Sequence, residues 1–506
     1  MVEGKSAEQA FSWQKIERIM NADSVSLHHY GLDASVEPTR QKRFYSDGDL
    51  IFSKIPYPEF SPVPEVTDLS PPPYTEIQII TDECSPTRRI HPICAWYRRM
   101  MPSSVTGHHV WLVVHALVVV GLIVLYFLRI MPISAGTIAI CELLLGVLVR
   151  NEIFISILHC LVALVPCLTY ELNRMVHCIG GLHVSSNVCA FLWLLISVAF
   201  EVHNLAVRIT GSAILVFIIA LSLTAVPIVR RRFHNTFERV HRYAGWTCLL
   251  VLIAHVVCLQ LERFSKFEAR ALLNVPVIML VSIISIIFLP WVCIRKVPVR
   301  FHQPSKNLTL VTFPEALYPY GSITRVSFDG HEWHAFAIAL TDPCSNQHSI
   351  LVAAVGDWTK KLAENYRESK LPDKIWTRRI KGLGFMYSIH AYRKVLIVCT
   401  GSGIAPALPY VKDPLPTTHT HLLWIAKEHE KTYGEHIWNL VQRLTPHVTL
   451  HDTAIHERPS AQLVEQYFYK TNAQAVFVVS NEKFTRDVTN ELWKKNIPCF
   501  GALFDS

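Results

Sequence analysis

Residues 395–411, VLIVCTGSGIAPALPYV, decide the fold of the C-terminal part of this chain. An unbroken apolar run, the pattern of a buried strand, leads directly into a glycine turn and then into a helix-like segment. Glycines let a backbone approach a pyrophosphate closely, and the N-terminus of a following helix offers free N–H groups. A glycine turn between a strand and a helix also occurs as a plain connection, so the flanking sequence must decide. The residues expected to bind a nucleotide are Gly401, Ser402, Gly403, Ile404, Ala405 and Pro406.

Strand-like and helix-like runs alternate downstream of this turn. They are LLWIA (422–426), GEHIWNLVQRL (434–444), VTLHD (448–452), SAQLVEQYFY (460–469) and AVFVVS (475–480). Alternating strands and helices predict a doubly wound parallel sheet with helices on both faces. We therefore expect residues 391–506 to form an α/β domain that binds a nicotinamide nucleotide.

Upstream, residues 300–390 contain short β-rich runs separated by turn residues. These runs are LTLVTF (308–313), ITRVSF (323–328), WHAFAIAL (333–340) and SILVAAV (349–355). Such spacing predicts an antiparallel β-barrel of around six strands.

Further upstream the chain has the composition of a membrane protein. Hydrophobic residues make up 51% of the 506 residues, charged residues only 17%, and the mean hydropathy is +0.27. Six apolar runs have spanning length: 109–128, 132–149, 178–200, 211–229, 242–260 and 275–294. They predict a six-helix transmembrane bundle over residues 105–296. A shorter apolar stretch, 153–168, contains Pro166 and is expected to lie along the inner face of the membrane.

The charges set the orientation of these spans. Arg150 ends the second run, three arginines from Arg230 end the fourth, and Arg295 with Lys296 ends the sixth. By the positive-inside rule both termini face the cytosol, in either the plasma membrane or an endomembrane. The net charge of +8 is therefore attributed to the arginine and lysine clusters at the cytosolic ends of the spans, and no nucleic-acid partner is expected. Residues 1–95 are polar and proline-containing, and they are expected to form a disordered cytosolic tail.

Motifs in both halves carry a family resemblance. They are VRNE (149–152), the run from Gly211 to His241, WHAFAI (333–338), GDWTKKL (356–362), KGLG (381–384), the GSGIAP turn and the terminal FDS. Together they resemble the membrane ferric reductases and NADPH oxidases of the ferredoxin–NADP reductase superfamily, over roughly residues 105–506. This resemblance implies FAD on the barrel, with contacts from His334, Phe336, Ala337, Ile338, Thr359, Gly382 and Gly384.

A narrower resemblance is to the TmpA-like integral membrane flavoproteins of fungi, carried by HCIGGLH (177–183), WHAFAI, KTYG (431–434) and FDS. Some members of that group are fused to, or occur beside, adenylate-forming enzymes, so such an enzyme is an expected partner. The resemblance implies a role in fungal developmental signalling (conidiation) or secondary metabolism. Lys427 follows the strand LLWIA, where related proteins choose between NADH and NADPH. A cation there favours the 2′-phosphate of NADPH, but a lone lysine is commonly just a solvated charge.

The chain departs from the family in its flavin signature, commonly HPFT. Ala335 replaces the proline and Ala337 replaces the hydroxyl residue, which in the family approaches the reactive edge of the flavin. Alanine has no side-chain donor. Flavin binding then depends on His334 and backbone groups, and hydride transfer is expected to be slowed or altered.

The heme histidines depart as well. In the family, two histidines 13–14 residues apart on the third span and two on the fifth hold two stacked hemes. The fifth span here has His241 and His255, but Phe191 lies fourteen residues after His177, and His183 only six. These histidines allow at most one heme b, with His241 as one axial ligand and either His177 or His183 as the other. Histidines in buried hydrogen bonds are the alternative, favoured for His255. Histidines without a spacing partner, such as His115 and His159, are expected at the membrane interface.

Two functions remain open at this stage. The first is a membrane-bound NAD(P)H-dependent flavoprotein oxidoreductase that does not reduce external iron. The second is a redox-inactive membrane sensor or scaffold that keeps the reductase fold. The intact glycine turn favours the first, and the altered flavin signature and missing histidine favour the second.

Overall fold

The computed structural model describes residues 104–130, 133–164, 169–263, 274–314, 317–342, 345–444 and 447–502. All of these lie in one compact unit, His91–Ser506. The N-terminal tail 1–95 and the terminal FDS motif lie outside the described residues.

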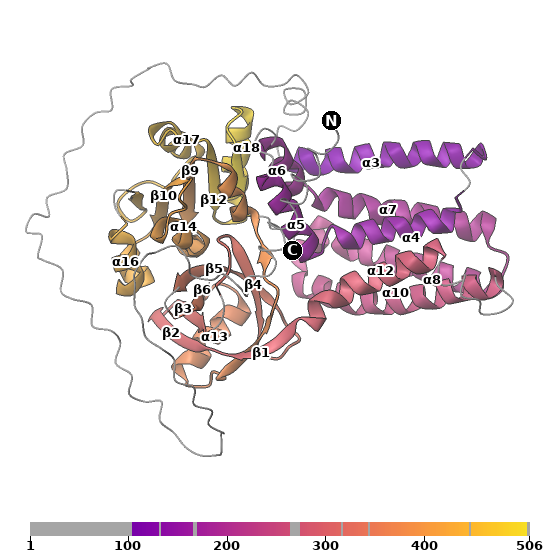
Figure 1. The fold of residues 1–506 in the computed structure, drawn as a ribbon, viewed down its shortest axis with the longest axis horizontal. Helices are drawn as coiled ribbons and strands as arrows, with labels where there is room; N and C mark the ends of the chain where they lie inside the picture. The colour runs from indigo at the N-terminus through magenta and orange to yellow at the C-terminus, as the bar shows by residue number, and fades with distance from the viewer. Residues whose placement is uncertain are drawn as a thin grey trace, which may run out of the picture. The chain divides into compact units, whose positions relative to one another are not determined.

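The first half of the described chain is helical (Figure 1). Its longer helices are α3 (Ser104–Phe127), α4 (Ala135–Leu148), α7 (Gly180–Ile196), α8 (Leu205–Ala225), α10 (His234–Arg263) and α12 (Val275–Val292). A π-helical turn, η1 (Ser197–Glu201), extends α7, and a short helix, α9 (Pro227–Arg232), follows α8. One hydrophobic cluster takes side chains from all six longer helices, among them Val119, Trp193 and Leu280.

Four of these helical segments are long and apolar enough to cross a membrane: 180–201, 205–225, 234–263 and 275–292. The apolar segments Trp111–Phe127 of α3 and Ala135–Leu148 of α4 are shorter. Many large apolar side chains of the bundle are exposed, such as Leu117, Val216 and Leu250. Exposed apolar surface on this scale is typical of helices that face lipid.

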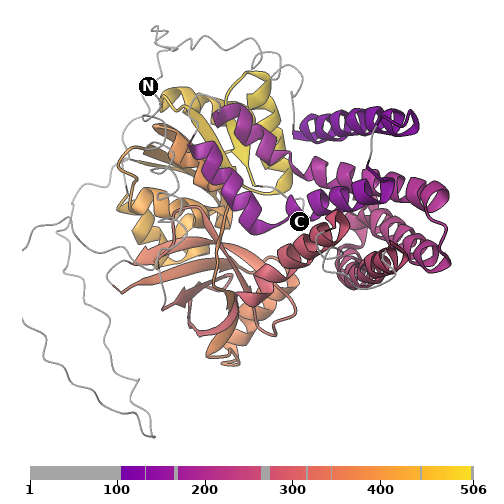
Figure 2. The same cartoon turned by 45° about the vertical axis from the view of Figure 1, so that its right-hand side comes forward.

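Two further helices, α5 (Glu152–Ala163) and α6 (Thr169–His177), occupy the stretch between α4 and α7. Asn151 caps α5, because its side chain accepts hydrogen bonds from the backbone N–H groups of Ile153 and Phe154. Both helices pack on the C-terminal half of the chain, as Figure 2 shows. The N–H of Leu383 donates to Ser156 Oγ at 2.8 Å, and Tyr170 joins a core cluster that contains Phe500.

An antiparallel sheet follows α12. Its strands are β1 (Ile294–Pro298), β2 (Arg300–Ser305), β3 (Leu308–Phe313), β4 (Ser322–Ser327), β5 (His334–Asp342), β6 (Gln347–Ala353), β7 (Lys374–Arg378) and β8 (Gly382–Leu383). The strand order is β1-β7-β4-β5-β6-β3-β2, with β8 paired to β4. The edge strands β1 and β2 are separated only by Val299, so the sheet curls around a core that includes Phe313 and Ile350. Helix α13 (Asp357–Arg367) contributes Leu362 to that core.

The C-terminal part is a five-stranded parallel sheet of order β11-β10-β9-β12-β13. Its strands are β9 (Lys394–Thr400), β10 (His419–Ala426), β11 (Val448–Asp452), β12 (Ala475–Val479) and β13 (Cys499–Gly501). All four strand pairs are parallel, which confirms the prediction of a parallel α/β sheet.

Helices cover both faces of this sheet. The 3₁₀ helices are η2 (Phe385–Ala391) and η3 (Gly401–Ala407), and the α-helices are α14 (Leu408–Lys412), α15 (His429–Tyr433), α16 (Glu435–Gln442), α17 (Ala461–Lys470) and α18 (Glu482–Lys494). Leu408 and Ile437 pack on one face, and Val464 and Val488 on the other.

Candidate functional site

The glycine turn lies at the carboxyl end of β9, the central strand of the parallel sheet. Gly401 has φ +57°, in the left-handed region that residues with a Cβ rarely adopt. A Cβ at this position would also lie 3.0 Å from the hydroxyl of Tyr433. The indole N–H of the buried Trp424 donates to the Gly401 carbonyl at 2.9 Å and fixes the turn. Ligands of open α/β sheets bind at this edge.

Gly403 serves packing inside the protein. A Cβ there would collide with the backbone carbonyl of Val479 at the end of β12. The helix that the sequence predicts after the turn is short, because η3 leads into α14, which has only five residues. A phosphate at this edge therefore relies on the turn itself more than on a long helix dipole.

Two hydroxyls that the sequence analysis missed meet beside the turn. Thr400 is the last residue of β9, Ser480 directly follows β12, and their oxygens lie 2.5 Å apart. Both positions are the carboxyl ends of neighbouring parallel strands. The rule that ligands bind at this edge could have singled them out.

Lys427 and Asp452 mark the same edge farther along the sheet. Lys427 is exposed and directly follows β10. Asp452 ends β11, and its Oδ1 accepts hydrogen bonds from the N–H groups of Ala454 at 2.8 Å and Glu428 at 3.0 Å. These bonds, that from Ala454 above all, hold the pKa of Asp452 below its usual range. One exposed cation and one carboxylate therefore lie at the carboxyl ends of β10 and β11.

Strand β5, which carries the flavin signature, has two different faces. His334 and Phe336 face Trp358 of α13, with ring centroids at 4.5 Å and 5.9 Å. Ala335 and Ala337 face the other side and pair with Arg325 and Ile323 of β4.

The alanine face of β5 leads toward the glycine turn. Farther along the strand, Ala339 is fully buried in the cluster that includes Ile404 and Ala407 of η3. Ala335 by contrast is exposed. Strand β5 is therefore exposed at Ala335 and buried at Ala339, where it packs against η3. This contact between β5 and η3 is called the seam.

The other predicted flavin contacts are engaged in protein interactions. Thr359 Oγ1 accepts from the N–H groups of Val355 and Gly356 at 3.0 Å, which caps α13. Ile338 is buried in the sheet. Gly382 lies against α5, where a Cβ would sit 3.7 Å from Glu152, and the Gly384 N–H donates to the Gly321 carbonyl at 2.9 Å.

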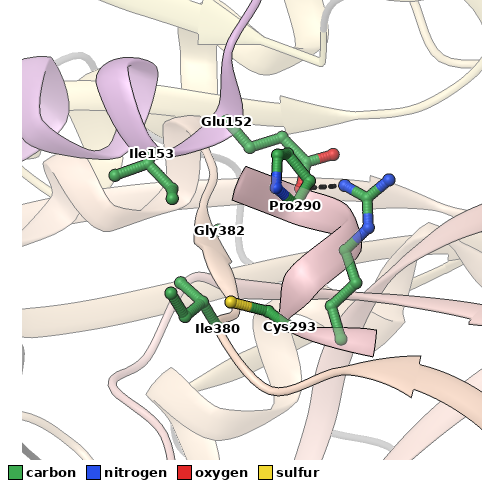
Figure 3. A pocket seen from close by; sticks show the side chains of 7 residues that line it. Glu152, Ile153, Pro290, Cys293, Ile380 and Gly382 are labelled. Carbon is green, nitrogen blue, oxygen red and sulfur yellow. Dashed lines mark hydrogen bonds and ion pairs between the residues drawn. The ribbon is translucent and has the colours of Figure 1, made fainter. Parts of the chain in front are cut away.

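Glu152 joins α5 to the antiparallel sheet. Its carboxylate pairs with Arg325 of β4 and, at 3.0 Å, with Arg378 of β7. Figure 3 shows Glu152 above a small cavity, with Pro290 and Cys293 from the end of the bundle and Gly382 around it. The cavity volume is about 10 Å³, room for one water molecule.

A flavin fits this structure unequally along its length. Ala335 and Ala337 have small side chains, and their strand partners on the same face are Arg325 and Ile323. The backbone donors of Leu383 and Gly384, in contrast, already have protein acceptors. A flavin phosphate at this point would have to replace those bonds or use other donors.

The bundle histidines lie at different levels along the helices, and the level nearer the start of α7 and α10 is called the inner level. His183 of α7 and His241 of α10 are close enough to interact electrostatically, and Arg150 lies near both. His183 Nδ1 contacts the Gly146 carbonyl at 2.8 Å. That bond leaves Nε2 as the acceptor, the arrangement usual for a metal-ligating histidine. Of the two pairings that the sequence leaves open for His241, the structure brings His183 to it, because His183 and His241 interact electrostatically.

His177 and His255 lie elsewhere. His177 ends α6, and its ring lies 6.2 Å from that of Trp493 on α18, so it belongs to the contact with the α/β domain. His255 Nδ1 contacts Thr210 Oγ1 at 2.9 Å. A Cβ on Gly211 would collide with Val198 and lie 3.2 Å from the His255 ring, so His255 and the π-helical turn lie at one depth.

His159 is buried and His115 is half-buried, and each contacts a side chain of another element. Their place at the membrane interface stays a prediction. His115 contacts Ser185 Oγ at 2.8 Å and Glu142 Oε1 at 3.2 Å, between α3, α4 and α7. His159 of α5 lies against η2, 3.5 Å from Ser388. Their partners come from other helices, so spacing along a single helix could not reveal them.

The fold and the site define a class of architecture: an apolar helical bundle, then a curled antiparallel sheet, then a parallel α/β sheet with a glycine turn at its carboxyl edge. A family model described as "Adenylate-forming reductase 03009, C-terminal domain" matches residues 385–506.

Two relatives from Coprinopsis cinerea match a larger part of the chain. Adenylate-forming reductase 06235 is 30% identical over 391 residues, and Adenylate-forming reductase 03009 is 29% identical over 390 residues. Each match covers 73% of this chain but only 37% of the relative.

Solved structures with a similar arrangement are remote. The ferredoxin reductase in carbazole 1,9a-dioxygenase has a TM-score of 0.34 at 13% identity, over 42% of this chain and 70% of its own. A flavohemoglobin from Malassezia yamatoensis has a TM-score of 0.35 at 12% identity, over 73% and 99%. We draw no conclusion on function from likenesses at this level.

Proposed function

We propose that this chain is a membrane-anchored, NAD(P)H-dependent flavoprotein oxidoreductase. The observation that carries the proposal is the seam between β5 and η3. There the alanine face of the flavin-signature strand meets the glycine turn of the parallel sheet. The turn at Gly401 would hold the nicotinamide nucleotide and Ala335 and Ala337 would lie beside the flavin, so the two binding positions belong to elements that adjoin at this seam. FAD, when bound, supplies the hydride acceptor and passes electrons on.

The chain's own residues bind and orient the nucleotide. The turn at Gly401, Ser402 and Gly403 receives the phosphates, with Ile404, Ala405 and Pro406 fixing its path. The hydroxyls of Thr400 and Ser480 stand beside it as hydrogen-bonding groups. Lys427 favours NADPH over NADH through the 2′-phosphate.

The membrane half anchors this unit. We propose that α3, α4, α7, α8, α10 and α12 are six spans, with both termini in the cytosol and α5 and α6 on the inner side. The spans then bring the curled sheet, as an FAD-binding barrel, close to the bilayer. One heme b between His183 and His241 would accept electrons from the flavin. The family matches to adenylate-forming reductases support an adenylate-forming enzyme as a functional partner, in fungal secondary metabolism or conidiation.

The second candidate is a redox-inactive sensor or scaffold. Two observations favour it: Ala337 offers no hydroxyl to a flavin, and the donors of Leu383 and Gly384 are already used. Such a protein would keep the fold and the membrane anchor without electron transfer.

An absorbance spectrum of the purified chain tests the proposal. Flavin bands that bleach anaerobically on NADPH addition are the expected result. A Soret band of the size expected for one heme per chain would support heme binding between His183 and His241. A chain with no flavin, even after incubation with FAD, would establish the scaffold instead.

A further inference from the structure

The parallel sheet carries a second concave site at the edge opposite the glycine turn. A cavity of 430 Å³ lies at the amino ends of β9, β10 and β11, beside the last turn of α17. Strand β9 is seven residues long, so about 20 Å separate this cavity from the turn at Gly401. The volume is within the range of small-molecule sites.

The side chains around this cavity that can be charged near neutral pH are all basic. Among the described residues that line it, five are lysine or histidine and none is aspartate or glutamate: Lys394, His419, His421, His447 and Lys470. The ring of Tyr467 completes the wall, with the Lys470 ammonium 5.4 Å from its centroid.

Strand register puts these groups on one face of the sheet. Lys394 pairs with His419, and His421 pairs with Leu396, whose side chain belongs to the face covered by α17 and α18. Residues opposite one another in a sheet share a face, and so do residues two apart on one strand. The basic side chains of β9 and β10 therefore converge beneath α17.

Like charges in one cavity cost free energy unless an anion neutralises them. The effect is visible at His421, whose pKa is lowered by burial first and then by the charges of His447 and Lys470. His421 Nε2 contacts Thr449 Oγ1 at 2.8 Å, which orients the ring toward β11. The cavity therefore combines several cationic donors with one aromatic surface.

We propose that this cavity binds a phosphate ester, with the phosphate held by Lys394, Lys470 and the three histidines and the organic part against Tyr467. This site is independent of the nicotinamide site, so it stands whether or not the oxidoreductase proposal does. A soluble nucleotide-like phosphate and a phosphoinositide headgroup share the required chemistry.

The test measures binding of inorganic pyrophosphate to the full chain in detergent by titration calorimetry. Lys394→Gln and Lys470→Gln should each weaken binding about five-fold, the equivalent of roughly 1 kcal/mol. The matched control is Lys494→Gln, because Lys494 is an exposed lysine of α18 outside the cavity, and it should leave binding unchanged. Saturating NADPH should not compete.

The pH dependence adds a readout that a lysine-only surface would not show. Binding should tighten as the pH falls from 8 to 6, because protonated histidines gain an anionic partner. Inositol 1,4-bisphosphate, compared with pyrophosphate, identifies the source: tighter binding of the inositol probe points to a lipid headgroup. Absence of binding at millimolar pyrophosphate would overturn the proposal. Competition by NADPH, or equal losses in Lys494→Gln, would do so as well.

Discussion

At the scale of single residues, the packing of the glycine turn decides which residue can be substituted to test nucleotide binding. A substitution at Gly403 would press on the Val479 carbonyl, so lost nucleotide binding could reflect local damage. Ser402 already has a Cβ and is half-buried at the same turn. It is therefore the better probe.

We expect Ser402→Asp to weaken NADPH binding at least about ten-fold, because a carboxylate beside the pyrophosphate repels it. Ser402→Asn, which is isosteric with aspartate but neutral, should bind within a few-fold of wild type. Fluorescence titration with NADPH measures both. Equal NADPH affinities of the two variants would show that the phosphates do not bind at this turn.

Ala337 provides the second residue-scale prediction. If the missing hydroxyl limits hydride transfer, Ala337→Thr should speed anaerobic flavin reduction by NADPH about ten-fold or more. Ala337→Val has nearly the same shape without the donor, so it should show no gain. Stopped-flow absorbance gives both rates. A gain of the same size in the valine variant would show that volume, not a hydrogen bond, is responsible.

The sequence predicted the turn but only part of what surrounds it. Gly401 was found because strand, glycine and helix are adjacent in the chain. Thr400 and Ser480 are 80 residues apart and meet only when β9 and β12 pair. Likewise the role of Gly403 depends on Val479, which no local pattern links to it.

At the scale of elements, a buried polar contact joins α3, α4 and α7. Ser185 donates its proton to the Leu182 carbonyl at 3.1 Å, so its oxygen accepts from His115 Nδ1. One proton then remains to be shared between His115 Nε2 and Glu142, which keeps the pair neutral overall. A neutral pair costs far less in an apolar bundle than either charge alone.

This proton count distinguishes two substitutions at Glu142. Glu142→Gln can donate to His115 Nε2 and should be tolerated. Glu142→Leu leaves that nitrogen unpaired and should destabilise the bundle by about 1–3 kcal/mol. Thermal unfolding of the detergent-solubilised chain measures the difference. A leucine variant as stable as the glutamine variant would show that the contact contributes nothing.

The packing of α5 on η2 should depend on pH through His159. Burial lowers the pKa of His159 to about 4, against about 6.5 in the unfolded chain. The folded state therefore disfavours the proton. The stability that this group contributes is complete above about pH 6.5 and is lost as the pH falls toward 4.

At pH 5 the loss amounts to about 2 kcal/mol, from roughly 1.4 kcal/mol per pH unit below 6.5. Hydrogen exchange of the α5 amides at pH 7 and pH 5 measures it locally. His159→Leu should abolish the difference, since neither Ser388, which contacts the ring, nor Asn173, which accepts a hydrogen bond from Ser388, titrates. An unchanged difference in that variant would assign the effect to another group.

The sequence predicted a helix over 153–168, and α5 (Glu152–Ala163) covers the first part of it. Its position outside the spans rests on apolar length and arginine positions and stays a prediction. Its contacts with Leu383, Ser388 and the two arginines of β4 and β7 involve partners more than 170 residues away. Such contacts leave no local period in the sequence.

At the scale of the whole molecule, the depths of the histidines decide whether electrons can cross the bundle. His183 and His241 are neighbours, so α7 and α10 can be compared residue by residue from that level. His255 lies fourteen residues beyond His241, about 21 Å along the helix. The equivalent position on α7 is Ser197, not Phe191, because His183 rather than His177 lies at the inner level.

A transmembrane route needs a second redox centre at the outer level. Ser197 is buried at the start of the π-helical turn, and its short hydroxyl is no substitute for an imidazole on heme iron. His255 itself contacts Thr210, and the Gly211–Val198 contact closes the space beside it. His115 lies at the level of Ser185, two residues from His183, and so belongs to the inner half.

We therefore expect at most one heme per chain and no reduction of external metal. Heme quantification by the pyridine hemochrome method on purified protein should give a ratio of one or below. His183→Ala and His241→Ala should each abolish the Soret band, whereas His255→Ala should leave it intact, because among the described residues the inner level is where two spans each offer an imidazole. Two hemes per chain, or cell-surface ferric reduction that depends on His255, would contradict the argument and restore a path across the membrane.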